Sequence, residues 1–165
     1  MKTIPAEEGY PLALLDTYLA MIQNSSECGM FRKLYVRTPD GLKEVIRDGD
    51  LACAYFVSSI LTLFGLVECV HTTVGATVAD MVASGWVEID KNQPDAIQPG
   101  NVLVWEPKLC DDGLHHRHIG FAISASVGLS NVSEARQPGF HLINFGEKNR
   151  AIERIFTHPK LVPTV

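Results

Sequence analysis

The chain of 165 residues lacks the features that mark nucleic-acid-binding and membrane-spanning proteins. No basic cluster is longer than two residues, and 14 basic against 19 acidic residues give a formal net charge of −5, so nothing suggests a nucleic-acid partner. No uncharged apolar run approaches the roughly 18 residues that a bilayer span requires. We therefore expect neither nucleic-acid binding nor a membrane span.

The N-terminal stretch does not have the form of a signal peptide. It reads MKTIPAEEGYPLALLDTYLAMIQ, in which Glu7 and Glu8 precede the apolar part and Asp16 interrupts it. We expect a cytoplasmic protein as the chain is written. Action outside the cell stays open, through a dedicated secretion route, release by a phage or a leader that the given sequence does not include.

The cysteines form no C-x-x-C pair, which argues against a structural zinc site and a thioredoxin-like redox motif. The four are Cys28, Cys53, Cys69 and Cys110. In a cytoplasmic protein such cysteines are expected to be free thiols. Internal repeats, linkers and low-complexity tracts are also missing, so we expect one domain and no cofactor.

Hydrophobic periodicity predicts helices in the first half of the chain and strands in the second. Helices are expected over 11–23, 52–64 and 73–84, with Asp48 and Asp50 as candidate N-caps of the second and Gly85 ending the third. Two short strands are expected within 31–50, around the turn 39–41. Further strands are expected over 86–89, 101–105, 118–124, 140–145 and 151–157. This order is typical of an α+β domain with an antiparallel sheet.

Cys53 is the best candidate nucleophile among the four cysteines. It falls in the first turn of a predicted helix, where unpaired N–H groups favour the thiolate and lower the pKa of the thiol. Cys28 and Cys110 are in predicted loops, and Cys69 follows the helix. A small apolar residue buried in the core is the alternative interpretation of Cys53.

A nucleophilic thiol requires an imidazole, and the imidazole requires an orienting partner. His118 opens the predicted strand 118-HIGFAIS-124, from which its side chain can project into a cleft. Thirteen residues later, Asn131 lies where the chain can return beside that strand. Its carbonyl oxygen is a candidate to accept from the imidazole and fix its tautomer.

Four motifs together resemble the papain-like cell-wall cysteine peptidases and amidases of the NlpC and CHAP groups. They are 53-CAYFVSSIL-61, 97-IQPGNVLVW-105, 118-HIGFAI-123, and the pair 130-SN-131 with 150-RAIERIFTHP-159. The resemblance departs from the family pattern at Ala52 and Asn101, where the family commonly has aspartate. It implies a papain-like α+β fold, with N-terminal helices packed on an antiparallel sheet and the nucleophile at a helix N-terminus. The catalytic core would span 48–158, with 1–47 as an extension or cap.

The resemblance also implies the roles of the site residues. Cys53 would be the nucleophile, His118 the general base and then acid, and Asn131 the residue that orients His118, with Glu134 and His141 as alternatives for this third position. The reaction would hydrolyse an amide, usually of a bacterial peptidoglycan peptide, through a thioester acyl-enzyme. Tyr55 and Trp105 are candidates for lining the substrate groove, with core packing as the alternative for both.

Two other functions compete with the hydrolase interpretation. A non-catalytic binding module with the same fold would share every core motif, because fold alone does not give function. The loop 110-CDDGLHHRH-118 contains Cys, Asp and His ligands suited to zinc, although it lacks the helical spacing of H-E-x-x-H. An exposed polar loop is the alternative interpretation of that segment.

Overall fold

The computed structural model describes residues 10–110 and 112–161. Its helices are α1 (Leu14–Asn24), α2 (Cys53–Leu63) and α3 (Val74–Ala83). Its strands are β1 (Tyr35–Thr38), β2 (Gly41–Glu44), β3 (Val87–Ile89), β4 (Val102–Leu109), β5 (His115–Ala122), β6 (Val127–Val132), β7 (Gln137–Leu142) and β8 (Ile152–Thr157). Short 3-10 helices occur at Gly29–Phe31, Gly146–Lys148 and Pro159–Leu161.

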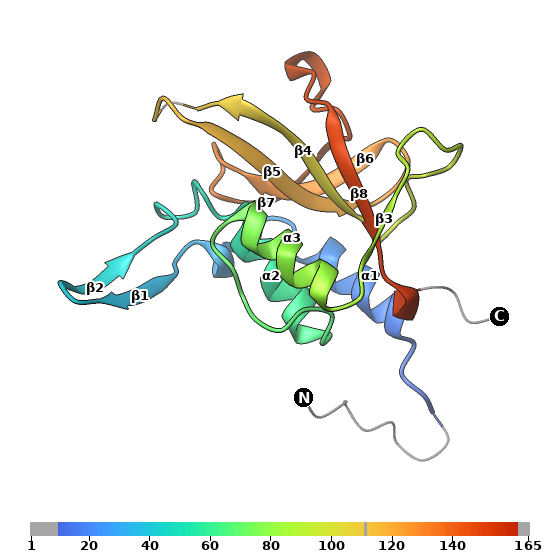
Figure 1. The fold of residues 1–165 in the computed structure, drawn as a ribbon, viewed down its shortest axis with the longest axis horizontal. Helices are drawn as coiled ribbons and strands as arrows, with labels where there is room; N and C mark the ends of the chain where they lie inside the picture. The colour runs from blue at the N-terminus through green and yellow to red at the C-terminus, as the bar shows by residue number, and fades with distance from the viewer. Residues whose placement is uncertain (1–9, 111, 162–165) are drawn as a thin grey trace.

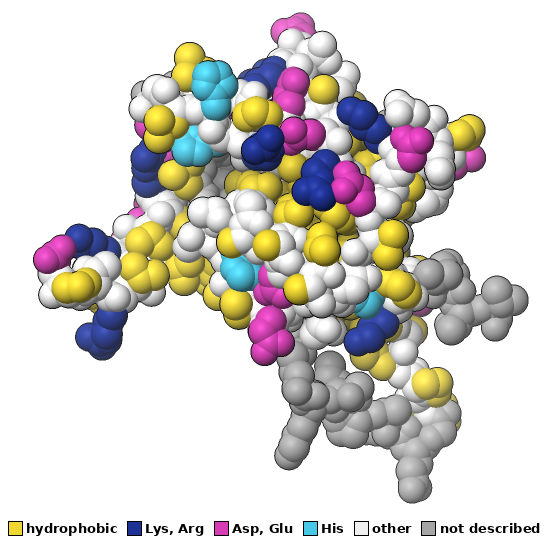
Figure 2. Space-filling model, in the orientation of Figure 1, with side chains coloured by type: hydrophobic (Ala, Val, Ile, Leu, Met, Phe, Trp, Pro, Cys, Tyr) yellow, Lys and Arg dark blue, Asp and Glu magenta, His cyan; other side chains and the backbone are white. Residues whose placement is uncertain are grey.

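The strands form two antiparallel sheets (Figure 1). The large sheet has the order β3-β8-β4-β5-β6-β7, so β5 is an inner strand between β4 and β6. The small sheet is the hairpin β1-β2, which projects from the rest of the molecule (Figures 1 and 2). Tyr35 and Leu42 of this hairpin are exposed. A bulge between Trp105 and Lys108 shifts the register of β4 against β5.

Hydrophobic side chains are buried on both faces of the large sheet, because successive residues of a strand point to opposite sides. The face toward α2 contributes Val102, Val104, Ile119, Phe121, Leu129 and Phe156 to one core cluster. The opposite face contributes Leu103, Trp105, Ala122 and Ile155 to a second cluster. The position of a residue in β5 therefore decides which cluster it meets.

Helix α2 packs against β5 because it is apolar on most of its circumference. Ala54, Phe56 and Val57 are buried, and the ring of Phe56 meets that of Phe121 edge-on at a centroid distance of 5.5 Å. Burying one such aromatic side chain stabilises the fold by about 1.5–3 kcal/mol. This packing fixes the first residue of α2, Cys53, close to the sheet.

The predicted N-caps of α2 are wrong. The N-cap residue is Ala52, whose side chain makes no capping hydrogen bond. Asp48 instead forms ion pairs with Arg32, Lys33 and Arg136, at 2.7, 2.9 and 2.9 Å. Its carboxylate joins three segments of the chain and does not serve the helix.

The predicted fold class is also wrong. Among the described residues, eight strands in two sheets outweigh three short helices. This arrangement is not clearly the papain-like α+β domain of N-terminal helices packed on an antiparallel sheet. Hydrophobic periodicity identified single elements but underestimated the number of residues in strands. Strands β4 and β5 are longer than predicted, and periodicity does not indicate β6.

Several local predictions are confirmed. All three helices form within two or three residues of their predicted bounds, and the 39–41 turn joins β1 to β2. Gly85 follows α3 with a φ of 97°, a value that L-residues rarely adopt. No helix within the described ranges is long and apolar enough to cross a membrane.

Candidate functional site

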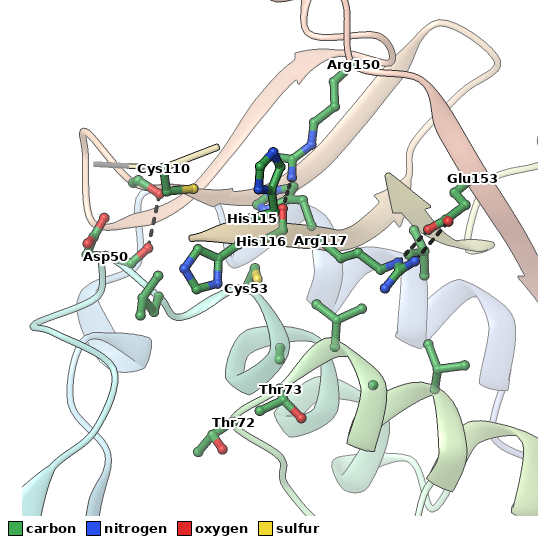
Figure 3. Close-up of a pocket in the computed structure, with 18 of the residues that line it drawn as sticks. Asp50, Cys53, Thr72, Thr73, Cys110, His115, His116, Arg117, Arg150 and Glu153 are labelled. Atoms are coloured by element: carbon green, nitrogen blue, oxygen red, sulfur yellow. Dashed lines mark hydrogen bonds and ion pairs between the residues drawn. The ribbon is translucent and has the colours of Figure 1, made fainter. Parts of the chain in front are cut away.

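A cavity of about 780 Å³ lies between the start of α2, the segment before α3 and the first half of β5 (Figure 3). Cys53 and His118 both line it, although 64 residues separate them along the chain. Thr72 and Thr73 form part of the wall opposite the sheet, and Arg150 lines the cavity from the segment before β8. Two residues predicted to act together therefore border one space.

Cys53 is the first residue of α2, within the first turn where the sequence places it, but its thiol is not activated by that position alone. Burial raises the pKa of the Cys53 thiol, and this effect outweighs the backbone N–H groups of Ile119 and Ala54 and the charge of Arg150, which lower it. The expected low-pKa thiol is therefore absent. Cys53 is a protonated thiol at neutral pH and needs a base to become a nucleophile.

His118 lies on the face of the sheet opposite the helix-side cluster that includes Ile119. Its ring packs near Trp105, with centroids 5.6 Å apart. Pairing of β5 with β6 begins at Gly120 and Ser130, so His118 has no partner residue on β6. His118 lines both the Cys53 cavity and a second cavity of about 700 Å³.

A chain of hydrogen bonds holds the imidazole of His118. Its Nε2 lies 2.7 Å from the Ser130 hydroxyl, which lies 2.8 Å from Nε2 of His141. The other nitrogen of His141, Nδ1, lies 2.8 Å from the Leu142 carbonyl oxygen. Only a protonated Nδ1 can donate to that oxygen, so in a neutral ring Nε2 of His141 is an acceptor.

The direction of the whole chain follows from this. The Ser130 hydroxyl donates to His141 and accepts from Nε2–H of His118. His118 in its neutral form then carries its proton on Nε2 and leaves Nδ1 with a free lone pair. Nδ1 is therefore the atom of His118 that can act as a base.

Both histidines are neutral at pH 7. Burial, assisted by the positive charge of Arg150 and by repulsion from His141 whenever that ring is protonated, lowers the pKa of His118 to about 3. Burial also lowers the pKa of His141, partly opposed by its hydrogen bond to Leu142. Neutral rings are what the donor and acceptor assignment above requires.

Asn131 does not orient His118. Asn131 and Ser130 are neighbours on β6, so their side chains point to opposite faces of the sheet. The side-chain amide of Asn131 donates to the Gly49 carbonyl oxygen at 2.8 Å. Its Oδ1 is buried and has no hydrogen-bond partner within the described part of the chain. Of the two alternatives, Glu134 pairs with Lys148 at 2.7 Å, while His141 reaches His118 through Ser130.

The hydrogen bonds that His118 forms do not include one to Cys53. Within residues 10–110 and 112–161, no hydrogen bond joins the Cys53 sulfur to an imidazole. The two groups therefore share a cavity without a hydrogen bond between them in this conformation.

Arg150 and Asp50 are charged residues that line both cavities, and Arg150 is the cation of the two. Its Nε donates to the Glu106 carbonyl oxygen at 2.8 Å, and its terminal nitrogen donates to the His116 carbonyl oxygen. These two carbonyl groups position the guanidinium, but because they are neutral they do not cancel its positive charge. That charge stabilises a Cys53 thiolate and disfavours a charged His118.

The two predicted substrate-binding residues do not line either cavity. Trp105 is completely buried, and its indole N–H donates to the Ile143 carbonyl oxygen at 2.7 Å. Tyr55 packs against the helix-side cluster, near the ring of Phe31. Core packing, the alternative for both residues, accounts for their positions.

The segment 110–118, expected to be a loop, includes the first four residues of β5, so His115, His116 and His118 lie on a strand. His116 pairs with Asp112 at 2.8 Å, and Asp112 also pairs with Arg47 at 3.1 Å. The Cys110 thiol faces the Lys108 carbonyl oxygen. Asp111 lies outside the described residues; among the described ones this segment does not gather three metal ligands around a point.

Ser130 and Arg150 are the residues that sequence reasoning missed. The sequence contains one indication of Ser130: the glycines Gly120 and Gly128, which lie on the same face of the sheet as Ser130. A Cβ at Gly120 would lie 2.5 Å from that of Ser130, and a Cβ at Gly128 would lie 2.9 Å from the His141 ring. The two glycines thus make room for the hydrogen-bonded chain.

The comparisons with known proteins give no family. No family model matches the chain, and no curated protein is significantly similar to it in sequence.

Proposed function

We propose that the chain is a cysteine-dependent hydrolase that cleaves an amide bond, with Cys53 as nucleophile and His118 as general base. One observation carries this proposal. Cys53, at a helix start, and a neutral His118 with its Nδ1 lone pair free line the same cavity. A thiol, a base and a held tautomer are the components that thiol-dependent acyl transfer needs.

The reaction begins when Nδ1 of His118 takes the proton of the Cys53 thiol and the sulfur bonds to the amide carbonyl carbon. Backbone N–H groups at the start of α2 and the positive charge of Arg150 stabilise the negative oxygen that forms. The imidazolium then protonates the departing amine, which leaves a thioester. His118 next activates water, which releases the acid and restores the thiol.

Proton transfer requires Nδ1 and the sulfur to approach within hydrogen-bond reach, directly or through one water. Such contacts commonly tighten only when substrate is bound, since substrate excludes solvent and orders the side chains. Ser130 and His141 serve this step by keeping the proton of His118 on Nε2.

The substrate class that we propose is a peptide amide of bacterial peptidoglycan. Such peptides carry free carboxylates, and Arg150 presents a half-buried cation at the cavity wall. A guanidinium held by two backbone carbonyls is suited to bind a carboxylate in two parallel hydrogen bonds. This places the acidic part of the substrate next to the reacting thiol.

The test is incubation of the purified chain with a set of muropeptides, followed by mass spectrometry. Cleaved products, each amide gaining one water, should form with the parent protein and with Cys28→Ser, a thiol control outside the cavity. They should be absent with Cys53→Ala and strongly reduced with His118→Gln. Cleavage by Cys53→Ala at the parent rate would refute the nucleophile.

A non-catalytic binding module is the second candidate, and it is favoured by the raised pKa of Cys53 and the lowered pKa of His118. Both groups are then neutral and unpaired with each other. If the parent and Cys53→Ala bind a muropeptide equally and neither cleaves any member of the set, this second function replaces the first.

A further inference from the structure

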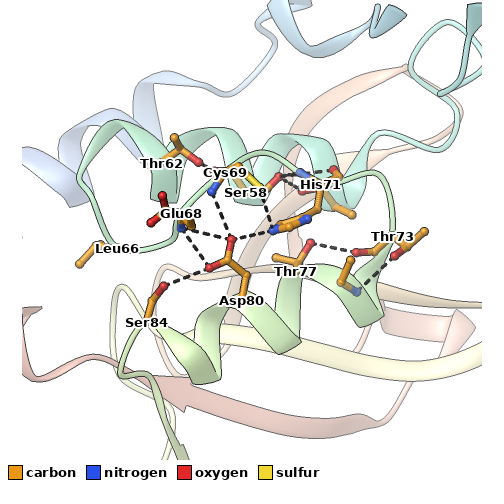
Figure 4. Close-up of polar contacts among 12 residues, drawn as sticks. Ser58, Thr62, Leu66, Glu68, Cys69, His71, Thr73, Thr77, Asp80 and Ser84 are labelled. Atoms are coloured by element: carbon orange, nitrogen blue, oxygen red, sulfur yellow. Dashed lines mark hydrogen bonds and ion pairs between the residues drawn. The ribbon is translucent and has the colours of Figure 1, made fainter. Parts of the chain in front are cut away.

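A second cluster of reactive side chains lies between α2 and α3, away from the Cys53 thiol. The segment that joins the two helices carries Cys69 and His71, and α3 carries Asp80 beneath them (Figure 4). Nε2 of His71 is 2.7 Å from Oδ2 of Asp80 and 3.8 Å from the sulfur of Cys69. The three ligand atoms all lie within 4.8 Å of one another.

Hydrogen bonding alone does not use all three groups. Nε2 of His71 has a single in-plane site, which holds either a proton or a lone pair. If it donates to Asp80, it offers the Cys69 thiol no acceptor; if it accepts from the thiol, it faces the carboxylate without a proton. A cation among the three atoms would satisfy the sulfur, the nitrogen and the oxygen together.

The cluster is held in place by a second layer of hydrogen bonds. The backbone N–H groups of Glu68 and Cys69 donate to the Asp80 carboxylate at 3.0 and 3.2 Å, and the Ser84 hydroxyl donates at 3.0 Å. The backbone N–H of His71 donates to the hydroxyl of Ser58 on α2, at 2.8 Å. Such partners fix the orientation of metal ligands and strengthen binding.

The cluster is also open to solvent on the side of Cys69. Cys69 is exposed, so an incoming ion can reach the cluster from solvent.

We propose that Cys69, His71 and Asp80 form a zinc site. Sulfur, imidazole nitrogen and carboxylate oxygen are the ligand types that zinc prefers, whereas calcium and magnesium take oxygen ligands. Three protein ligands leave a fourth tetrahedral position for water or a small ligand. The next residues, Thr72 and Thr73, line the Cys53 cavity, so the zinc site adjoins its wall.

The test uses the full chain, purified without a histidine tag, freed of metal by a chelator and titrated with cobalt(II). Cobalt in a tetrahedral site with a thiolate ligand gives visible d–d bands and a sulfur-to-cobalt charge-transfer band. One equivalent should saturate both, and zinc should displace the cobalt. Circular dichroism of each variant establishes that it is folded.

Matched variants identify the ligands. Cys69→Ser should abolish the charge-transfer band, whereas Cys28→Ser and Cys110→Ser should retain it. Ser84→Ala, which removes only a supporting hydrogen bond, should weaken zinc binding by about 10-fold.

Two results would overturn the proposal: a folded parent chain without saturable cobalt binding, or a band lost in Cys110→Ser and kept in Cys69→Ser. The cobalt readout is independent of amide hydrolysis, because Cys53→Ala should bind cobalt as the parent does. The zinc site and the hydrolase function can thus fail separately.

Discussion

Replacing Ser130 with alanine tests whether the hydrogen-bonded chain sets the state of His118. The hydroxyl is completely buried and is the group that lies between His118 and His141. Without it, Nε2–H of His118 loses its acceptor and Nε2 of His141 loses its donor.

The cost follows from these two losses. A polar group left unpaired in a dry site costs about 1–3 kcal/mol. Both rings are partly exposed, so water can reach them, and we expect the lower end of that range for each. The free energy of unfolding should therefore fall by about 2 kcal/mol in total.

Urea unfolding, followed by tryptophan fluorescence, measures this loss. Ser126→Ala is the matched control, because Ser126 is exposed and its hydroxyl lies 3.4 Å from that of Ser124, its one side-chain partner among the described residues. That variant should change the free energy of unfolding by less than about 0.5 kcal/mol.

Long-range ¹⁵N–¹H NMR of the imidazole rings measures the tautomer. The parent should show His118 protonated on Nε2, and Ser130→Ala should show a mixture of tautomers. If Ser130→Ala retains the Nε2–H form and unfolds as Ser126→Ala does, then the hydroxyl does not orient His118.

Three further predictions concern the same site. Because burial holds the pKa of His118 near 3, below its unfolded value of about 6.5, its contribution to stability is present above pH 6.5 and is lost as the pH falls toward 3. Urea unfolding gives the free energy of unfolding at each pH between about 6.5 and 4.5. This free energy should fall less steeply with falling pH in His118→Gln than in the parent, by up to about 1.4 kcal/mol per pH unit. Equal slopes for the two proteins would contradict the lowered pKa. Gly120→Ala should destabilise the fold by about 1–3 kcal/mol, because its Cβ would lie 2.8 Å from the Leu129 carbonyl oxygen; an unchanged urea midpoint would show that the two strands can separate there. Alkylation of Cys53 by iodoacetamide, followed by peptide mapping, should still accelerate above about pH 9, and a plateau at neutral pH would mean that the thiol pKa is low after all.

Much of the local structure was predictable from the chain. Apolar residues at helical spacing identified α1, α2 and α3, and the turn 39–41 identified the β1-β2 hairpin. Each of these features depends on residues within one or two turns of each other, whose conformational preferences are local. The same reasoning placed Cys53 at the start of α2.

The electrostatic state of Cys53 was not predictable in this way. A helix start favours the thiolate, but the sheet that packs against α2 buries the sulfur, and burial outweighs the helix. The packing depends on residues of β5, more than 60 positions away. Only the folded chain shows which of the two effects is larger.

The sequence by itself determined the helices, the first hairpin and the position of the candidate thiol, because short-range spacing encodes them. The tertiary structure alone decided the sheet-rich fold, the side of β5 on which His118 lies and its contact with Ser130 in place of Asn131. Neighbouring residues of a strand point to opposite faces, so a shift of one position in register exchanges one partner for the other. That register is set by long-range strand pairing, which no local pattern contains.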